Sequence, residues 1–176
     1  MIPQDILERA KRVRLVILDI DGVMTDGRII YGIYGDELKF FDVTDGFGIA
    51  LLNNAGIKSV IITAKKSRMV KLRGRDLKVA KTYAGFIDKT IPFKKILKKF
   101  RVKPEEICFM GDDLIDLSVL RRVGFSVSVP NAVEEVKKVA HYITQKAGGR
   151  GAVREICDLI LKSQGKWDLA TSKYIK

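Results

Sequence analysis

A short apolar run that ends in two carboxylates is the feature that most constrains the fold of this chain. Residues 15–23 read LVILDIDGV, so four consecutive apolar residues lead directly to Asp19 and Asp21. A run of this kind is typical of a buried strand in a parallel sheet. Because an isolated ionised carboxylate is costly to bury, two acids at the end of such a strand indicate a cation or a reaction that uses them.

Strand-like apolar runs alternate with helix-like segments along most of the chain. We expect strands at residues 14–19, 58–62, 79–83, 107–110, 125–129 and 141–144, and helices at 45–54, 67–75, 89–100, 113–122, 133–140 and 151–163. A hairpin over about 28–43, with its turn at 34–36, breaks the alternation. Residues 165–176 have weak patterning and are expected to form a mobile tail. The pattern predicts an α/β fold over residues 1–176: one three-layer, Rossmann-like domain with a central parallel sheet and helices on both faces.

The charge balance favours an anionic small-molecule substrate. The chain has 176 residues, with 33 basic and 21 acidic side chains and a net charge of +12. Residues 92–103, PFKKILKKFRVK, place apolar residues on one helical face and lysines on the other, as a surface helix does. No aromatic platform interleaves with these lysines, so we expect no nucleic-acid partner. With no membrane-length apolar run, no secretory signal and no CxxC motif around Cys108 or Cys157, we expect a cytoplasmic protein without a membrane partner.

Polar residues follow three of the expected strands at the point where each strand ends. Because the carboxyl ends of parallel strands meet at one edge of a sheet, where ligands bind, we expect these side chains to converge. The residues concerned are Asp19, Asp21, Thr63, Asp112, Asp113 and Asp116.

A cluster with this many carboxylates needs a cation. Mg²⁺ suits it, because Mg²⁺ is usually held by few protein carboxylates together with substrate phosphate. A calcium loop counted from Asp19 has Met24 and Ile30 where such a loop needs Gly and Glu. Zinc is disfavoured because the single histidine, His141, lies in the apolar stretch VAHYI and is expected to be a packing residue. We therefore predict a Mg²⁺ site that handles a phosphate monoester.

Phosphoryl transfer assigns a role to each of four residues. Asp19 could attack phosphorus and form an aspartyl phosphate. Asp21 could protonate the leaving alkoxide and then deprotonate the attacking water. The Thr63 hydroxyl would donate to a phosphoryl oxygen, and Lys89 would balance the charge.

These motifs resemble those of the haloacid dehalogenase superfamily of phosphatases. The matching pieces are DIDGV at 19–23, Thr63, Lys89 and GDDLID at 111–116, in the family's order. The resemblance implies an Asp19 nucleophile, an Asp21 acid/base, and Mg²⁺ held by Asp19, the Asp21 backbone carbonyl and Asp112. It also places Asp113 and Asp116 just behind these ligands.

The chain departs from the family pattern after the second strand. Many members have Thr-Gly-Arg there, whereas this chain has Thr63-Ala64-Lys65. Lys65 or Lys66 could replace the arginine as a point charge in substrate binding.

Two further segments resemble the small superfamily members that carry a protruding hairpin in place of a cap domain. These are residues 26–48 and 147–168. This closer resemblance implies hydrolysis of an eight-carbon sugar-acid 8-phosphate, on the route to lipopolysaccharide. It also implies a homotetramer in which the hairpins form a central barrel and neighbouring subunits cover the active site. Arg73 falls at the position expected to bind the sugar carboxylate, and Gly46 is a further expected substrate contact.

Several alternatives remain open at this stage. A related nine-carbon sugar acid 9-phosphate could be the substrate, and a non-catalytic basic binding module is a more distant possibility. Asp113 could simply cap a helix, and Lys89 could simply begin one. The glycine-rich residues 148–151 could contact an anion through backbone amides or Arg150.

Overall fold

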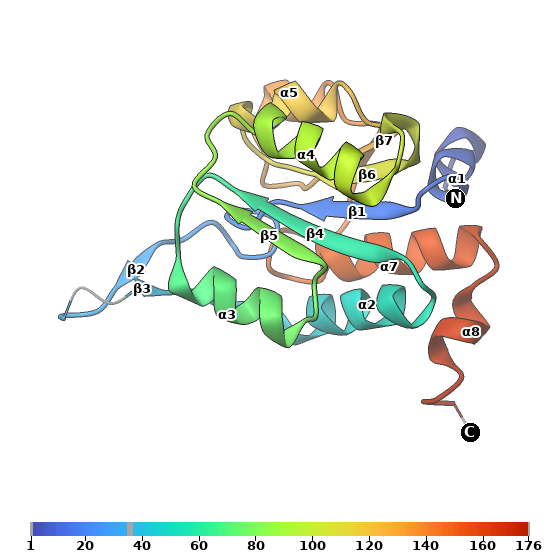
Figure 1. Ribbon diagram of the computed structural model, residues 1–176, viewed down its shortest axis with the longest axis horizontal. Helices are drawn as coiled ribbons and strands as arrows, with labels where there is room; N and C mark the ends of the chain where they lie inside the picture. The colour runs from blue at the N-terminus through green and yellow to red at the C-terminus, as the bar shows by residue number, and fades with distance from the viewer. Residues whose placement is uncertain (1, 35–36, 176) are drawn as a thin grey trace.

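A six-stranded parallel sheet forms the centre of the computed structural model, which describes residues 2–34 and 37–175 (Figure 1). The strands lie in the order β5-β4-β1-β6-β7-β8. Their bounds are β1 (Leu15–Leu18), β4 (Lys58–Thr63), β5 (Lys81–Ala84), β6 (Ile107–Met110), β7 (Phe125–Ser128) and β8 (Tyr142–Ile143). All five pairings between neighbours are parallel, which confirms the predicted fold class.

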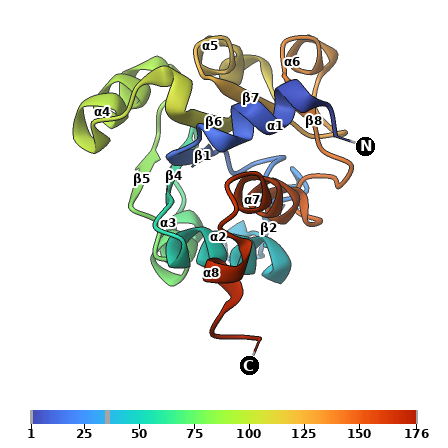
Figure 2. The same cartoon turned by 90° about the vertical axis from the view of Figure 1, so that its right-hand side faces the viewer.

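Helices cover both faces of this sheet and make it the middle of three layers. Helices α4, α5 and α6 lie on one face, and α2, α3 and α7 lie on the other (Figures 1 and 2). This double cover explains why the central strands β1, β6 and β7 are buried along their whole length. The helices are α1 (Gln4–Lys11), α2 (Val43–Asn54), α3 (Arg68–Asp76), α4 (Thr90–Phe100), α5 (Leu117–Leu120), α6 (Glu134–Lys137), α7 (Ala152–Ser163) and α8 (Trp167–Thr171), with 3₁₀ turns η1 (Pro104–Glu106) and η2 (Leu114–Asp116).

The predicted hairpin is present, with shorter strands than expected. Strand β2 (Ile30–Tyr31) pairs antiparallel with β3 (Glu37–Leu38), and the ribbon extends from the edge at which the parallel strands end (Figure 1). Of the expected turn residues, 35 and 36 lie outside the described residues. The hairpin therefore stands beside the strand tips, where the candidate site was expected.

Short helices account for most of the differences from the sequence-based expectations. The expected tail at 165–176 was wrong for residues 167–171, which form α8 and bury Ala170 against α2. Helix α1 was not anticipated, although Ile6 and Ala10 are buried at helical spacing. The expected helix over 113–122 begins with η2 and becomes α-helical only at Leu117, and that over 133–140 is reduced to α6.

Several packing predictions are confirmed. Both cysteines are free and buried. His141 is hydrogen-bonded as expected, its Nδ1 accepting from the backbone N–H of Ser126 at 3.0 Å, but the residue is exposed rather than packed in the interior. Helix α4 buries Phe93 and Ile96, as its amphipathic pattern predicted.

None of the helices in residues 2–34 and 37–175 has the length and apolar composition needed to cross a membrane.

The glycine-rich loop before α7 packs directly on the loop that follows β1. A Cβ atom on Gly148 would lie 1.8 Å from the carbonyl oxygen of Gly22. The neighbouring Gly149 N–H donates to the carbonyl oxygen of Val23 at 2.9 Å. Only glycine at 148 allows this approach between two backbones. The glycine-rich loop before α7 therefore supports the loop that follows β1.

This contact predicts a large cost for Gly148→Ala. The added methyl group would overlap backbone that has no rotamer to move, so we expect a loss of about 2–3 kcal/mol in the free energy of unfolding. Gly56→Ala is the control, because Gly56 has open space around it and a φ of +76°, and only the backbone penalty of about 1–2 kcal/mol applies. Urea denaturation of both variants measures the difference, and equal losses would contradict this packing.

Candidate active site

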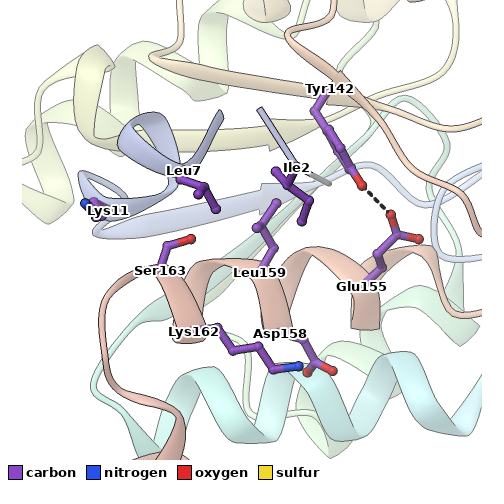
Figure 3. A pocket seen from close by; sticks show the side chains of 9 residues that line it. All are labelled: Ile2, Leu7, Lys11, Tyr142, Glu155, Asp158, Leu159, Lys162 and Ser163. Atoms are coloured by element: carbon purple, nitrogen blue, oxygen red, sulfur yellow. Dashed lines mark hydrogen bonds between the residues drawn. The ribbon is translucent and has the colours of Figure 1, made fainter. Parts of the chain in front are cut away.

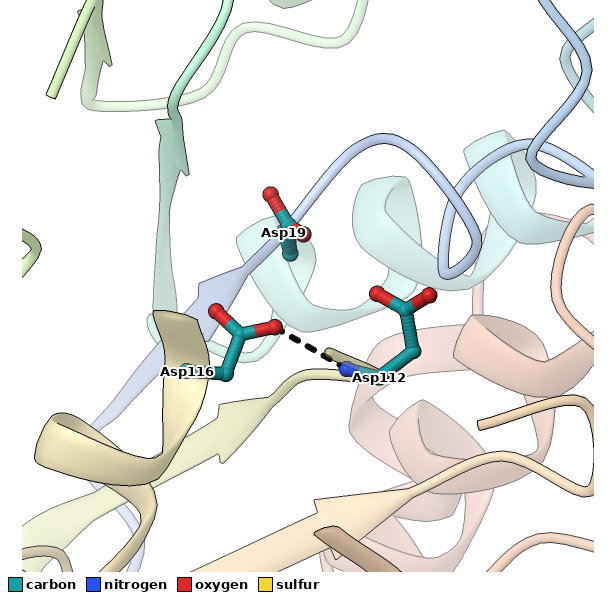
Figure 4. Close-up of side chains that lie close together, drawn as sticks. All are labelled: Asp19, Asp112 and Asp116. Carbon is teal, nitrogen blue, oxygen red and sulfur yellow. Dashed lines mark hydrogen bonds between the residues drawn. The ribbon is translucent and has the colours of Figure 1, made fainter. Parts of the chain in front are cut away.

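The candidate site lies where the order of the sheet reverses. Strand β1 lies between β4 and β6, with Leu18 opposite Ile61 on one side and Met110 on the other. Asp19 follows β1 directly, and its backbone N–H donates to the carbonyl oxygen of Met110 at 3.1 Å. Asp112 follows β6 by two residues, so this register brings the two acidic motifs together, as predicted (Figure 4).

A buried lysine lies among these acids. Lys89 immediately precedes α4, and its Nζ lies 2.9 Å from Asp19 Oδ1 and 2.5 Å from Asp116 Oδ1. Burial opposes the charge on Lys89, but the two carboxylates outweigh it and raise the pKa of the lysine. Lys89 is therefore a cation held inside the site.

Asp116 holds the loop after β6 in place. Its Oδ2 accepts hydrogen bonds from the backbone N–H groups of Asp112 at 3.0 Å and Asp113 at 3.2 Å, the first of which is drawn in Figure 4. Its Oδ1 faces Lys89, so both oxygens have partners. The Asp113 side chain instead accepts from the N–H of Leu114 at 2.7 Å and caps η2.

The remaining oxygens fit a divalent cation. Carboxylate oxygens of Asp19, Asp112 and Asp116 lie within 4.8 Å of one another. Burial raises the pKa of Asp112 to about 8, and Asp19 and Asp116 add to the effect. Within the described residues, no donor reaches the buried Oδ1 of Asp112. Both oxygens of Asp116 already have partners, Lys89 and the backbone N–H groups of the loop after β6. Asp19 and Asp112 are therefore the side chains that suit a hard cation such as Mg²⁺.

Thr63 and the two lysines after it lie at the same edge of the sheet. Thr63 is buried, ends β4, and its Oγ1 accepts from the N–H of Lys65 at 3.3 Å. Lys65 turns toward the hairpin, where its Nζ lies 2.9 Å from Glu37 Oε1. The Lys66 side chain lies instead against Gly85 in the loop after β5.

Arg73 and Gly46 are brought together at the start of α2. A Cβ atom on Gly46 would lie 2.6 Å from Arg73 Nη2. The same Nη2 donates to the carbonyl oxygen of Asp42 at 3.1 Å, and the guanidinium lies over the Phe41 ring at 5.5 Å. The contacts of the described residues do not join this pair directly to Asp19.

The sequence analysis missed three residues that contact the site. Lys39, on the hairpin, forms an ion pair with Asp21 and lies 3.2 Å from Glu37. Asn131 donates from Nδ2 to the carbonyl oxygen of Gly22 at 2.9 Å and accepts at Oδ1 from the N–H of Gly148 at 2.8 Å. The available signal for Asn131 was a polar residue two positions after the strand expected at 125–129.

A separate cavity of about 650 Å³ lies between α1, β8 and α7 (Figure 3). Its lining includes Ile2, Leu7 and Leu159, together with Tyr142, whose hydroxyl donates to Glu155 at 2.9 Å. None of the clustered acids lines it, so we place the chemistry at the strand tips rather than here.

The fold and the site together define a three-layer, Rossmann-like protein with a carboxylate-based centre at its strand tips. The family model for haloacid dehalogenase-like hydrolases matches residues 76–156. The 3-deoxy-D-manno-octulosonate 8-phosphate phosphatase of Escherichia coli strain K12 is 44% identical over 97% of this chain and 91% of its own length. The chain belongs to the haloacid dehalogenase-like hydrolases.

Two solved structures of relatives have nearly the same fold. The phosphatase of that name from Moraxella catarrhalis, in complex with magnesium, phosphate and a KDO molecule, has a TM-score of 0.93 and 40% identity, covering 97% of this chain and 98% of its own. The phosphatase of the same name from Yersinia pestis has a TM-score of 0.93 and 42% identity. The match covers 95% of this chain and 90% of the Yersinia pestis chain. The likeness extends over almost the whole chain.

The carboxylate cluster predicts stabilisation by Mg²⁺ that grows with pH. Because the pKa of Asp112 is raised to about 8, its proton competes with the cation much more strongly at pH 6 than at pH 9. At tenfold excess over its dissociation constant, Mg²⁺ should add about 1.4 kcal/mol, or about 3–6 °C in Tm. Differential scanning fluorimetry at both pH values measures this shift.

Two isosteric variants make this test specific. Asp112→Asn removes a proposed ligand and should abolish the Mg²⁺ shift. Asp113→Asn keeps the oxygen that caps η2 and should leave the shift intact. A Mg²⁺ shift that survives in Asp112→Asn would place the cation elsewhere.

Proposed function

We propose that the protein is a Mg²⁺-dependent phosphatase that hydrolyses 3-deoxy-D-manno-octulosonate 8-phosphate, in the synthesis of lipopolysaccharide precursor. The observation that carries this proposal is the 44% identity over 97% of the chain to enzymes of that name. The acid cluster at the strand tips supplies the chemistry that such an enzyme needs, and Lys89 lies within it.

The first half of the proposed reaction transfers the phosphoryl group to Asp19. A carboxylate oxygen of Asp19 forms a bond to phosphorus while the bond from phosphorus to the sugar oxygen breaks. The leaving alkoxide takes a proton from the Asp21 carboxyl group and departs as an alcohol. Lys89 fixes the orientation of Asp19 through Oδ1 and offsets its charge, and Thr63 donates its hydroxyl to a phosphoryl oxygen.

The second half returns the enzyme to its starting state. Water attacks phosphorus, its proton passes to the Asp21 carboxylate, and the bond between phosphorus and Asp19 breaks. The products are inorganic phosphate and the sugar acid, so one water is consumed for each ester cleaved. Asp116 keeps Lys89 and the loop after β6 in place through both halves.

Mg²⁺ would be held by Asp19, Asp112 and the backbone carbonyl of Asp21. When bound, it supplies positive charge that neutralises the carboxylates and the phosphate. The unpartnered Asp112 Oδ1 supports this assignment, as does the magnesium in the Moraxella catarrhalis relative.

The sugar part of the substrate would meet the basic groups beside the hairpin and α2. We assign Lys65 and Lys66 as point charges near the phosphate edge. Arg73 would bind the sugar carboxylate, and Gly46 leaves room for its guanidinium, which a side chain there would displace. The two buried, unpaired thiols accord with the cytoplasm as the proposed location.

We also assign a homotetramer, built through the hairpins, in which neighbouring subunits cover the site. Ile33 and Tyr34 are each 91% exposed, and Tyr31 and Phe40 are also exposed. Apolar side chains gathered on one protruding ribbon favour burial in an interface. A second copy is the simplest partner, because the elements formed by the described residues include no inserted lid that would exclude water from the strand-tip site.

Asp19→Asn should reduce phosphate release by about a thousandfold or more, because the covalent nucleophile is lost. Release is measured with Mg²⁺ and after EDTA treatment, using the eight-carbon 8-phosphate and a related nine-carbon 9-phosphate. We expect the higher kcat/KM for the eight-carbon substrate, and Asp113→Asn serves as the active control. A higher value for the nine-carbon ester would reassign the substrate, and undiminished release by Asp19→Asn would refute the mechanism.

Ile33→Glu should dissociate the tetramer, because it places a charge in the apolar interface. It should also lower kcat/KM, because the neighbouring subunits then no longer cover the active site. Sedimentation equilibrium gives the assembly state, and the phosphate assay gives the activity. Leu169→Glu is the matched control, since Leu169 is 61% exposed on α8, at the far end of the molecule from the hairpin (Figure 1). A wild-type monomer with full activity would contradict the assignment.

A further inference from the structure

The hairpin contributes a charged side chain to the acid/base position of the site. Lys39 follows β3 and forms an ion pair with Asp21 Oδ1. The Lys39 side chain has no solvent exposure, although most lysine side chains of folded proteins lie in water. A lysine enclosed in this way is held in one conformation rather than sampling many.

A second ion pair fixes Lys39 from the other side. Glu37 Oε1 lies 3.2 Å from Lys39 Nζ and 2.9 Å from Lys65 Nζ. Burial opposes the charge on Glu37, but hydrogen bonds from Lys65, Ser67 and Lys39 hold its pKa below the usual range. The chain of contacts therefore runs from the loop after β4, through the hairpin, to Asp21.

Asp21 needs such support more than the other acids do. Its side chain is 30% exposed, whereas Asp19 and Asp116 are buried against Lys89. A carboxylate that moves freely in solvent spends little time aimed at a leaving group, and catalytic groups lose much of their effect when orientation is lost. With Oδ1 held by Lys39, the second oxygen of Asp21 is left for the reaction.

We propose that Lys39 is a positioning residue that acts through Asp21, so that the hairpin orients the acid/base for proton transfer to the leaving group. The inference rests on the proposed function, in which Asp21 protonates the sugar oxygen as the bond to phosphorus breaks. Lys39 itself exchanges no proton and touches no substrate atom.

The leaving group provides the discriminating measurement. An alkoxide needs a proton from Asp21, whereas the anion of p-nitrophenol leaves without one. The value of kcat/KM reports only the steps up to release of the alcohol, so the later attack of water does not enter it. Lys39→Met keeps the length and packing of the side chain and removes its charge. We expect kcat/KM to fall about tenfold or more with the sugar-acid phosphate and less than about threefold with p-nitrophenyl phosphate.

Two further variants exclude a general effect on the protein. Lys39→Arg can restore the ion pair and should recover most of the activity toward the sugar-acid phosphate. Lys58→Met removes a lysine at the amino end of β4, away from the strand tips, and should change neither kcat/KM value.

A double-variant comparison separates positioning from substrate binding. If Lys39 acts through Asp21, adding Lys39→Met to Asp21→Asn should lower kcat/KM for the sugar-acid phosphate no further. A further loss in that background, an equal loss with both substrates, or no loss in Lys39→Met alone would overturn the inference. Phosphate release by the wild-type protein tells this failure apart from failure of the proposed function. If the proposed function is wrong, the wild-type protein releases no phosphate from the sugar-acid ester with Mg²⁺.

Discussion

The site depends on one buried cation, Lys89, held between Asp19 and Asp116. Removing a charged group from water costs several kcal/mol even after the protein relaxes, and only close ionic and hydrogen-bonded contacts offset that cost. Because Lys89 precedes α4, Asp19 follows β1 and Asp116 ends η2, the three charges join separate parts of the chain. Loss of Lys89 would leave two carboxylates in the interior without their cation, so the arrangement of the strand tips depends on electrostatics as well as on packing.

The topology of the sheet explains why this interaction forms where it does. Strands β4 and β5 lie on one side of β1, and β6, β7 and β8 lie on the other, so the loops that leave β1 and β6 diverge at the point where ligands bind in open α/β sheets. Two glycines allow the acidic side chains to approach the backbone of these loops closely. A Cβ on Gly22 would lie 2.0 Å from Asp112 Oδ2, and one on Gly111 would lie 2.6 Å from the Asp116 side chain.

The sequence was sufficient to predict the parts that follow from periodicity and parallel register. Apolar runs predicted the parallel sheet, and once the strands are parallel, Asp19 and Asp112 must meet at one edge. The role of Lys39 could not be found in this way, because its partner Asp21 lies 18 positions away and 33 basic residues offer no means of choosing one. Helix α8 was missed because five residues are too few for a helical apolar pattern to be recognised, although Ala170 is buried and Trp167 packs against the core.

The hairpin has two chemically different sides, and these would link the proposed assembly to the proposed catalysis. Its inner side holds Lys39 and Glu37 against the strand tips, while Ile33 and Tyr34 extend into solvent. A two-stranded ribbon with strands of two residues has little stability of its own. Its position over Asp21 therefore depends on contacts outside the ribbon, which the charged network supplies on the inner side and which the proposed homotetramer would supply on the outer side. In the proposed homotetramer, subunit contacts would thus order the hairpin, and the hairpin would in turn order Asp21.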